Sequence, residues 1–372
     1  MKTTQFHGYH EQNAHMTEFA GYDMPVWYTS ISDEHLAVRN SSGIFDVSHM
    51  GRIHVIGPDA GSMLEKLVPT NVVSQPPGKA IYTLFLNHDG GILEDLIVMK
   101  MSEGDYLVVV NAVNTKTDLE HIQSHSRGFD VSVQNITESS AMIALQGPDS
   151  GRILQPHTTA NLGELKRFRC LETQVMGHDS VVSRTGYTGE DGFEIIIYGM
   201  TNENLSSALE VWETLARVAK PCGLAARDSL RIEAGYPLYG ADISTATDPF
   251  EADLGWVVSA GRNGYIGSEA LARARAPGPK RLRRGIVLDE KIPRSGFEVL
   301  NTASDLIGKV TSGTFSPILR KGIAMGLISA TDSAFGGSVR VRVRDLTVGG
   351  NIVQPPFYDE KLYGWKRQSN GN

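Results

Sequence analysis

Cysteine is scarce in this sequence, which has only Cys170 and Cys222 among its 372 residues, far apart and in no metal-site spacing. Two isolated cysteines predict reduced thiols in a cytosol-like compartment and argue against a disulfide framework. Long apolar runs are also lacking, because no stretch approaches the roughly 18 residues of a membrane helix. Residues 1–16 have neither the apolar centre of a signal peptide nor the Arg-rich character of a transit peptide. We therefore expect a cytoplasmic protein, or one already processed to a mature form, with no membrane segment.

Positive charge is in short supply, since 35 Lys and Arg against 42 Asp and Glu leave a net charge of -7. This balance argues against nucleic acid as the main ligand. The patterns GxGxxG, GxxxxGK and GxSxG are absent, so nothing supports a Rossmann, P-loop or nucleophile-elbow site. His7, His10 and His15 lie close together, but no Cys or carboxylate is in register with them, and we expect no metal site. The length allows two or three domains.

The stretch 84–100 (LFLNHDGGILEDLIVMK) is the most informative part of the chain. Its NHDGG cluster predicts a hairpin turn between two strands, because Asn, Asp and Gly tolerate positive φ. The second strand carries Glu94 and Asp95, which must point to opposite faces because strand side chains alternate. At least one carboxylate therefore lies among apolar neighbours, which is costly unless it is paired or serves a site. An edge strand with both acids in water, or with one acid paired to an Arg, is the alternative.

A short repeat indicates two lobes of similar construction. A strand followed by GPDAG at 57–61 and a helix recurs as a strand followed by GPDSG at 147–151 and a helical stretch. Chance recurrence of so short a motif is the alternative. Further along the chain, the pattern at 181–198 predicts a hairpin with a glycine-rich turn. The spacing of apolar residues at 205–219 predicts an amphipathic helix.

The chain becomes β-rich after the segment 276–279 (APGP), which looks like a linker between a region 1–278 and a C-terminal domain 279–372. Strict alternation at 339–344, with further short strands before it, predicts a small antiparallel barrel. The basic run 280–284 predicts a solvated linker face, and a docking patch for an acidic partner is the alternative.

These motifs, taken in order, resemble the glycine cleavage system T proteins, the tetrahydrofolate-dependent aminomethyltransferases. The resemblance extends from about His15 to Tyr363. The segments that carry it are 19–25 (FAGYDMP), 34–39 (EHLAVR), 45–50 (FDVSHM), 90–95 (GGILED), 186–194 (GYTGEDGFE), 222–228 (CGLAARD), 230–235 (LRIEAG) and 311–317 (TSGTFSP). Each segment alone is weak, and the ordered set is specific.

The resemblance implies an α+β fold, a three-domain cloverleaf in which two interleaved α+β lobes and a C-terminal antiparallel β-barrel surround a central folate-binding cavity. It also implies a role in glycine catabolism and one-carbon metabolism. A lipoylated H protein would bring an aminomethyl group, and transfer to tetrahydrofolate would give 5,10-methylenetetrahydrofolate, ammonia and reduced lipoyl. The implied partners are therefore the H protein and folate, with no nucleic acid and no membrane.

The family's site residues transfer to positions of this chain through the same motifs. Asp95 would be the catalytic carboxylate facing the reacting part of folate, and Glu194 would accept the donor pair of the pterin. Tyr187 would line that pocket, and Arg227 would bind the carboxylates of the folate tail. The remaining implied folate contacts are Tyr82, Asn111, Tyr239 and Trp256, and the residues implied on the substrate side are Arg294 and Tyr363. Glu94 stands where many relatives have Asp, and we expect little consequence because it points away from Asp95.

Two other functions are compatible with much of this pattern. The first is another folate-dependent one-carbon transferase or demethylase of the superfamily, acting on a small methylated sulfur or nitrogen compound. It would keep the folate pocket and lose the H-protein site. The second is a non-enzymatic folate-binding assembly factor, whose relatives carry a Lys-Gly-Cys-Tyr-x-Gly-Gln signature that this chain lacks.

Overall fold

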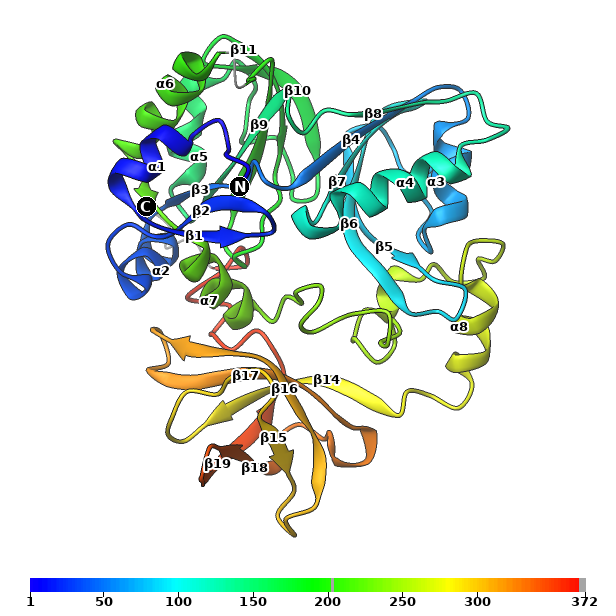
Figure 1. Ribbon diagram of the computed structural model, residues 1–372, viewed down its shortest axis with the longest axis vertical. Helices are drawn as coiled ribbons and strands as arrows, with labels where there is room; N and C mark the ends of the chain where they lie inside the picture. The colour runs from blue at the N-terminus through cyan, green and yellow to red at the C-terminus, as the bar shows by residue number, and fades with distance from the viewer. Residues whose placement is uncertain (202–203, 368–372) are drawn as a thin grey trace. The chain divides into compact units, whose positions relative to one another are not determined.

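The computed structural model describes residues 1–201 and 204–367 (Figure 1). The chain forms two compact units, each built from two segments. The first unit comprises Met1–Thr83 and Glu94–Arg227, and the second comprises Leu84–Leu93 and Asp228–Asn372. The predicted boundary between residues 278 and 279 stays a prediction.

The first unit is built on a six-stranded sheet, a five-stranded sheet and one short antiparallel hairpin. The six-stranded sheet has the order β10 (Cys170–Val175), β11 (His178–Ser183), β12 (Gly192–Tyr198), β9 (Ser140–Gln146), β3 (Gly43–Asp46) and β13 (Lys220–Pro221). The five-stranded sheet has the order β5 (Lys79–Leu86), β6 (Ile92–Ser102), β7 (Asp105–Val110), β4 (Gly51–Ile56) and β8 (Ser132–Asn135). The hairpin pairs β1 (His15–Phe19) with β2 (Tyr22–Trp27).

Helices of the first unit lie between these strands in the chain. They are α1 (His7–Asn13), α2 (Ile31–Asn40), α3 (Ala60–Leu67), α4 (Thr115–His125), α5 (Ser150–Leu154) and α6 (Leu205–Ala216), with short 3-10 turns at η1 (Ala112–Asn114) and η2 (Gln155–His157). The predicted helix at 205–219 is thus confirmed as α6, and the predicted hairpin at 181–198 is confirmed as β11 and β12. Helix α7 (Leu224–Ala234) begins in the first unit and continues into the second.

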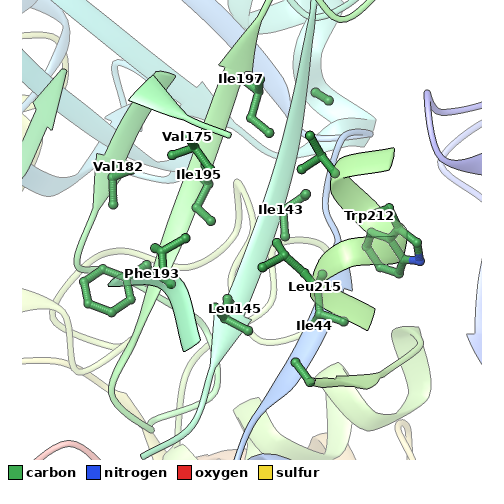
Figure 2. Packing of buried hydrophobic residues seen from close by; sticks show 14 of the residues in the cluster. Ile44, Ile143, Leu145, Val175, Val182, Phe193, Ile195, Ile197, Trp212 and Leu215 are labelled. Carbon is green, nitrogen blue, oxygen red and sulfur yellow. The ribbon is translucent and has the colours of Figure 1, made fainter. Parts of the chain in front are cut away.

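A continuous apolar core joins the six-stranded sheet to α6. Strands β9 and β12 direct Ile143, Leu145 and Ile195 toward one another, and α6 adds Trp212 and Leu215 (Figure 2). All five side chains have no exposed surface. Each buried Ile or Leu contributes about 1.5–3 kcal/mol relative to exposure, so this cluster is a main source of the unit's stability.

The predicted strand–turn–helix repeat is present twice, with similar backbone geometry. β4 ends at Ile56, the next residue Gly57 has a φ of 147°, and α3 begins at Ala60, directly after Asp59. β9 ends before Gly147, whose φ is 127°, and α5 begins after Asp149 in the same way. Positive φ favours glycine at both turns, which explains why the GPD motif recurs.

The predicted hairpin turn before Glu94 is also confirmed. Asn87 Oδ1 accepts hydrogen bonds from the backbone N–H of Asp89 at 2.9 Å and of Gly91 at 2.8 Å. Gly90 takes a φ of 84°. Asn therefore supports this turn with its side chain, and Gly supplies the positive φ, as the composition predicted.

The second unit contains a closed antiparallel barrel. Its strand order is β14 (Arg281–Leu288), β17 (Lys321–Ser329), β16 (Leu306–Ser316), β15 (Glu298–Leu300), β18 (Ser338–Val343) and β19 (Leu346–Val353). The remaining elements of this unit are η3 (Gly255–Val257), α8 (Ser268–Arg275) and η4 (Ala330–Asp332). Val339 and Val341 of β18 point into the barrel core, as the alternation of this strand predicted. The α+β fold with a C-terminal barrel is therefore confirmed, and the central folate cavity stays a prediction.

The prediction of a solvated linker face at 280–284 was wrong for residues 281–284. These four residues belong to strand β14, and Arg283 is buried. Arg283 donates to the carbonyls of Ala252 at 2.8 Å and Gly235 at 2.7 Å, and Arg281 pairs with Glu251 at 2.8 Å. The guanidinium donors of Arg281 and Arg283 are thus engaged inside the unit, and the docking patch stays a prediction. Among the described residues, no helix is long and apolar enough to cross a membrane.

Candidate active site

Three of the predicted site residues come together around the carboxylate of Asp95. Asp95 lies on β6 and is half-buried. Tyr82, on the neighbouring strand β5, donates its hydroxyl to Asp95 Oδ2 at 3.0 Å. Asn111, directly after β7, donates Nδ2 to Asp95 Oδ1 at 2.9 Å. Two donors from two neighbouring strands therefore hold this carboxylate in one orientation.

Strand register explains why residues 95 and 111 meet. β6 and β7 are antiparallel, and Ile97 pairs with Val109. Two residues further along each strand, Asp95 and Asn111 come opposite each other, within the reach of a cross-strand side-chain pair. The β6–β7 hairpin thus builds this part of the site from local pairing.

The strand alternation predicted for the two acids is confirmed. Glu94 has no exposed surface, while Asp95 on the opposite face is half-buried. The two carboxylates are nevertheless connected, because Asn111 Nδ2 also donates to Glu94 Oε1 at 2.6 Å. Glu94 Oε1 accepts the Asn111 backbone N–H at 2.7 Å as well, and Oε2 accepts Asn114 Nδ2 at 2.5 Å. Although Glu94 faces away from Asp95, it contacts the same asparagine, so its orientation alone does not make its role minor.

Burial makes the proton affinity of Glu94 unusual. Desolvation raises the pKa of Glu94 most strongly, and the nearby carboxylates of Asp118 and Asp95 raise it further, against the lowering effect of the asparagine donors. Burial and the charge of Asp95 likewise raise the pKa of Asp118, which lies on α4. Asp118 Oδ2 is inaccessible to solvent and has no hydrogen-bond partner in the part of the chain that the structure describes. Two like carboxylates in one buried region favour retention of a proton.

A second group of predicted residues lies around Arg227. Its guanidinium stacks 4.8 Å from the ring centroid of Tyr187, and the charge of Glu194 raises the pKa of Arg227 while burial, the larger effect, lowers it. Glu194 Oε2 accepts the hydroxyl of Thr185 at 2.6 Å. Its Oε1 accepts no hydrogen bond from any residue in the described part of the chain. One oxygen of a half-buried carboxylate is thus available to a ligand.

Two buried polar atoms beside this group lack partners. Arg227 Nη1 and His49 Nδ1 are both inaccessible to solvent and make no hydrogen bond to the described residues. Burial lowers the pKa of His49 to about 4, and the charges of Arg227 and Arg52 act in the same direction, so His49 is neutral at pH 7. A buried guanidinium N–H without an acceptor is costly. The arrangement therefore fits a ligand that supplies acceptor oxygens.

The glycine-rich loop 186–192 owes its position to Gln146 and Arg39. Gln146 Nε2 donates to the Thr185 carbonyl at 3.0 Å, and Gln146 Oε1 accepts the Thr188 hydroxyl at 2.9 Å. Arg39 Nη1 donates to the Thr188 carbonyl at 2.8 Å. A Cβ on Gly186 would lie 1.9 Å from Gln146 Oε1, so only glycine allows this close approach. The loop presents Tyr187 to Arg227 as a consequence.

Four predicted site residues belong to the second unit. Trp256 is 68% exposed and Tyr239 is half-buried, so both rings have surface for a ligand. Arg294 is exposed and donates Nη1 to the Gly313 carbonyl at 3.2 Å. Tyr363 lies 6.5 Å from Tyr358, edge to face. The roles predicted for these four residues stay predictions.

Sequence reasoning missed several residues of the two groups. They are His49, Asn114, Asp118 and Thr185. His49 lies in the FDVSHM segment and Thr185 directly precedes GYTGEDG, so proximity to a motif was an available signal for both. Asp118 is a lone acid within α4, and no local pattern distinguishes it from a solvated helix residue.

Two family profiles match the chain. The profile described as GCVT N-terminal domain matches residues 6–262, and the profile described as glycine cleavage T-protein C-terminal barrel domain matches residues 281–359. The aminomethyltransferase of Thermotoga maritima is 41% identical over 362 residues, which cover 96% of this chain and 97% of that protein. The aminomethyltransferase of Geobacillus kaustophilus is 42% identical over 365 residues, with 96% and 98% covered.

A solved structure is similar over nearly the whole chain. The crystal structure of glycine cleavage system aminomethyltransferase T from Bartonella henselae matches with a TM-score of 0.90 at 32% identity, covering 98% of this chain and 99% of that one. The similarity therefore includes both the N-terminal region and the barrel. This chain belongs to the glycine cleavage T-protein family of aminomethyltransferases.

Proposed function

We propose that this chain is the tetrahydrofolate-dependent aminomethyltransferase of a glycine cleavage system. It takes the aminomethyl group from a lipoylated H protein and transfers the one-carbon unit to tetrahydrofolate, with release of ammonia. The observation that carries the proposal is Asp95, a half-buried carboxylate held by Tyr82 and Asn111 on the strand whose GGILED motif resembles the family's catalytic segment.

Glu194 and Arg227 each offer a polar group that matches a part of folate. A pterin presents an amide N–H and an exocyclic amine side by side, and a carboxylate with an available oxygen accepts such a donor pair. Folate also ends in glutamate carboxylates, which supply the acceptor that the buried Arg227 Nη1 lacks. Tyr187 holds the guanidinium plane by stacking on it.

Bound tetrahydrofolate supplies the nucleophilic nitrogens that receive the carbon. Asp95 carries a negative charge near the carbon that becomes electron-poor as ammonia departs, and it stabilises that charge. The same carboxylate is positioned to accept a proton from the attacking side. Much of the remaining rate enhancement comes from holding two reactants in line.

The decisive experiment incubates the full chain with aminomethyl-lipoyl H protein and tetrahydrofolate, and measures ammonia and 5,10-methylenetetrahydrofolate together. We expect both products in equal amounts, and neither when the H protein or the chain is omitted. Methyl transfer from a small methylated compound without H protein would instead identify a demethylase. Folate binding with no turnover of either donor would identify an assembly factor.

The cytoplasmic location and the domain boundary between residues 278 and 279 belong to the same proposal. The N-terminal family profile ends at residue 262 and the barrel profile begins at residue 281, which is compatible with that boundary. Strand β14 begins at Arg281.

A further inference from the structure

We propose that Glu94 is a positioning residue for the one-carbon transfer, which acts through Asn111 to set the orientation of the Asp95 carboxylate. The inference rests on the proposed function, because it assumes that Asp95 acts in the reaction. It gives a role to a residue that faces away from Asp95 on strand β6.

The first step of the argument is the amide of Asn111. Its Nδ2 has two hydrogens, and its acceptors are Glu94 Oε1 at 2.6 Å, Asp95 Oδ1 at 2.9 Å and, more distantly, the Asp95 carbonyl at 3.2 Å. If the amide turned over, its carbonyl oxygen would face the oxygens of both acids, which is repulsive. Glu94 therefore keeps the donor side of Asn111 directed at Asp95.

The second step is the backbone. Glu94 Oε1 also accepts the Asn111 N–H at 2.7 Å, and Oε2 accepts Asn114 Nδ2 at 2.5 Å. Both partners belong to the turn that follows β7, so one side chain fixes the turn and the amide together. Without these acceptors, the side-chain amide of Asn111 would keep only its bonds to Asp95, and the carboxylate would lose a fixed donor.

The third step is the burial of Glu94. A carboxyl group with no exposed surface is costly in a protein interior, where an apolar residue of equal size would pack without penalty. All three of its hydrogen bonds end on Asn111 and Asn114. Raised pKa values of Glu94 and of Asp118 agree with a proton retained in this region, which makes a neutral acceptor sufficient.

The test compares Glu94→Met, which removes the acceptor oxygens at similar volume, with Glu94→Gln, which keeps one. We expect Glu94→Met to lower kcat by about 10- to 100-fold and to leave the KM for tetrahydrofolate within about threefold, since positioning acts on the reacting carboxylate. Glu94→Gln should restore most of the turnover. The matched control is Glu65→Met, which removes a carboxylate bonded to the backbone of Val72 and Val73, and it should keep normal kcat.

A double-mutant cycle separates positioning from a general structural role. In an Asp95→Asn background, Glu94→Met should cause no further loss of kcat, because the group that it positions is already gone. An equal additional loss in that background, or an unchanged kcat for Glu94→Met alone, would overturn the inference. Slow turnover by Asp95→Asn with normal turnover by Glu94→Met would overturn only this inference. Full turnover by Asp95→Asn would overturn it together with the catalytic role proposed for Asp95.

Discussion

The arginines of this chain differ in whether their buried donor atoms have partners among the described residues. Many of the buried arginines of this chain bind backbone carbonyls, as Arg52 does with Ser48 and Met50 at 3.0 and 2.6 Å. Arg227 differs, because its Nη1 is buried without a partner. Since buried donors are nearly always satisfied in native proteins, Arg227 is a stronger binding candidate than its charge alone indicates.

Glu194 should contribute to folate affinity through its available carboxylate oxygen. Glu194→Ala removes the acceptor that we propose for the pterin donor pair, and we expect folate binding to weaken by roughly 2–4 kcal/mol, the range for losing a charged partner in a pocket. Isothermal titration calorimetry with tetrahydrofolate measures the change. An unchanged affinity would remove Glu194 from the pocket.

Arg227 should not be replaceable by lysine. Arg227→Lys keeps the positive charge but loses the planar fork and its stacking on Tyr187. We expect folate affinity to fall by about tenfold, as measured by fluorescence titration, with little loss of fold. If Arg227 serves only the fold, affinity and turnover will stay normal and only the unfolding midpoint will move.

His49 should make the fold sensitive to acid. Its pKa is about 4 in the folded chain and about 6.5 when unfolded, so its contribution to stability is complete above pH 6.5 and is lost as the pH falls through 4. The difference corresponds to roughly 3 kcal/mol. His49→Gln should therefore show a shallower loss of unfolding free energy between pH 6.5 and 4 in urea titrations. Parallel pH profiles for both proteins would contradict this assignment.

At the scale of the elements, the alternation of residues within a strand predicted which way each side chain faces. The two-residue period of β6 placed Glu94 and Asp95 on opposite faces because strand alternation is obligatory. The same period could not indicate that Asn111 would join them, since that contact depends on the register between β6 and β7. The basic run was misread for a related reason, because the partners of Arg281 and Arg283 come from distant segments of the chain.

The loop 186–192 provides a test at this scale. Gly186→Ala would bring a Cβ within 1.9 Å of Gln146 Oε1, in a loop where Gln146 is fully buried. We expect a loss of about 1–3 kcal/mol in unfolding free energy, typical of overpacking, and weaker folate binding because Tyr187 moves with the loop. Thermal unfolding and calorimetry measure the two effects.

Gly151→Ala is the matched control for that change. Gly151 lies in helix α5, and its nearest neighbour to a new Cβ is Phe193 Cε2 at 3.8 Å, an ordinary contact. Alanine should be neutral or stabilising there by up to about 1 kcal/mol, because glycine is a poor helix former. If both variants change the unfolding free energy by the same amount, the close approach of Gly186 to Gln146 does not affect stability.

For the whole molecule, the ordered set of motifs predicted the fold and the family better than it predicted the interior of the site. The barrel and the two sheets follow from alternation and turn residues, which local chemistry dictates. Asp118 had no pattern of its own, because a buried polar residue on an ordinary helix is identified only by its neighbours. The sequence therefore indicated Asp95, Tyr82 and Asn111 of the candidate site, and the structure added the neighbours Asn114 and Asp118.

The turnover of Asp95→Asn tests the central claim most directly. This change keeps the shape of the side chain and removes the charge, and an amide is easier to bury than a carboxylate, so the fold should survive. In the coupled assay with aminomethyl-lipoyl H protein and tetrahydrofolate, we predict a fall in kcat of about 10²- to 10³-fold. Folate affinity should change far less, because the charge acts mainly toward the transition state. A variant that folds, binds folate and turns over at the normal rate would contradict the catalytic role of Asp95.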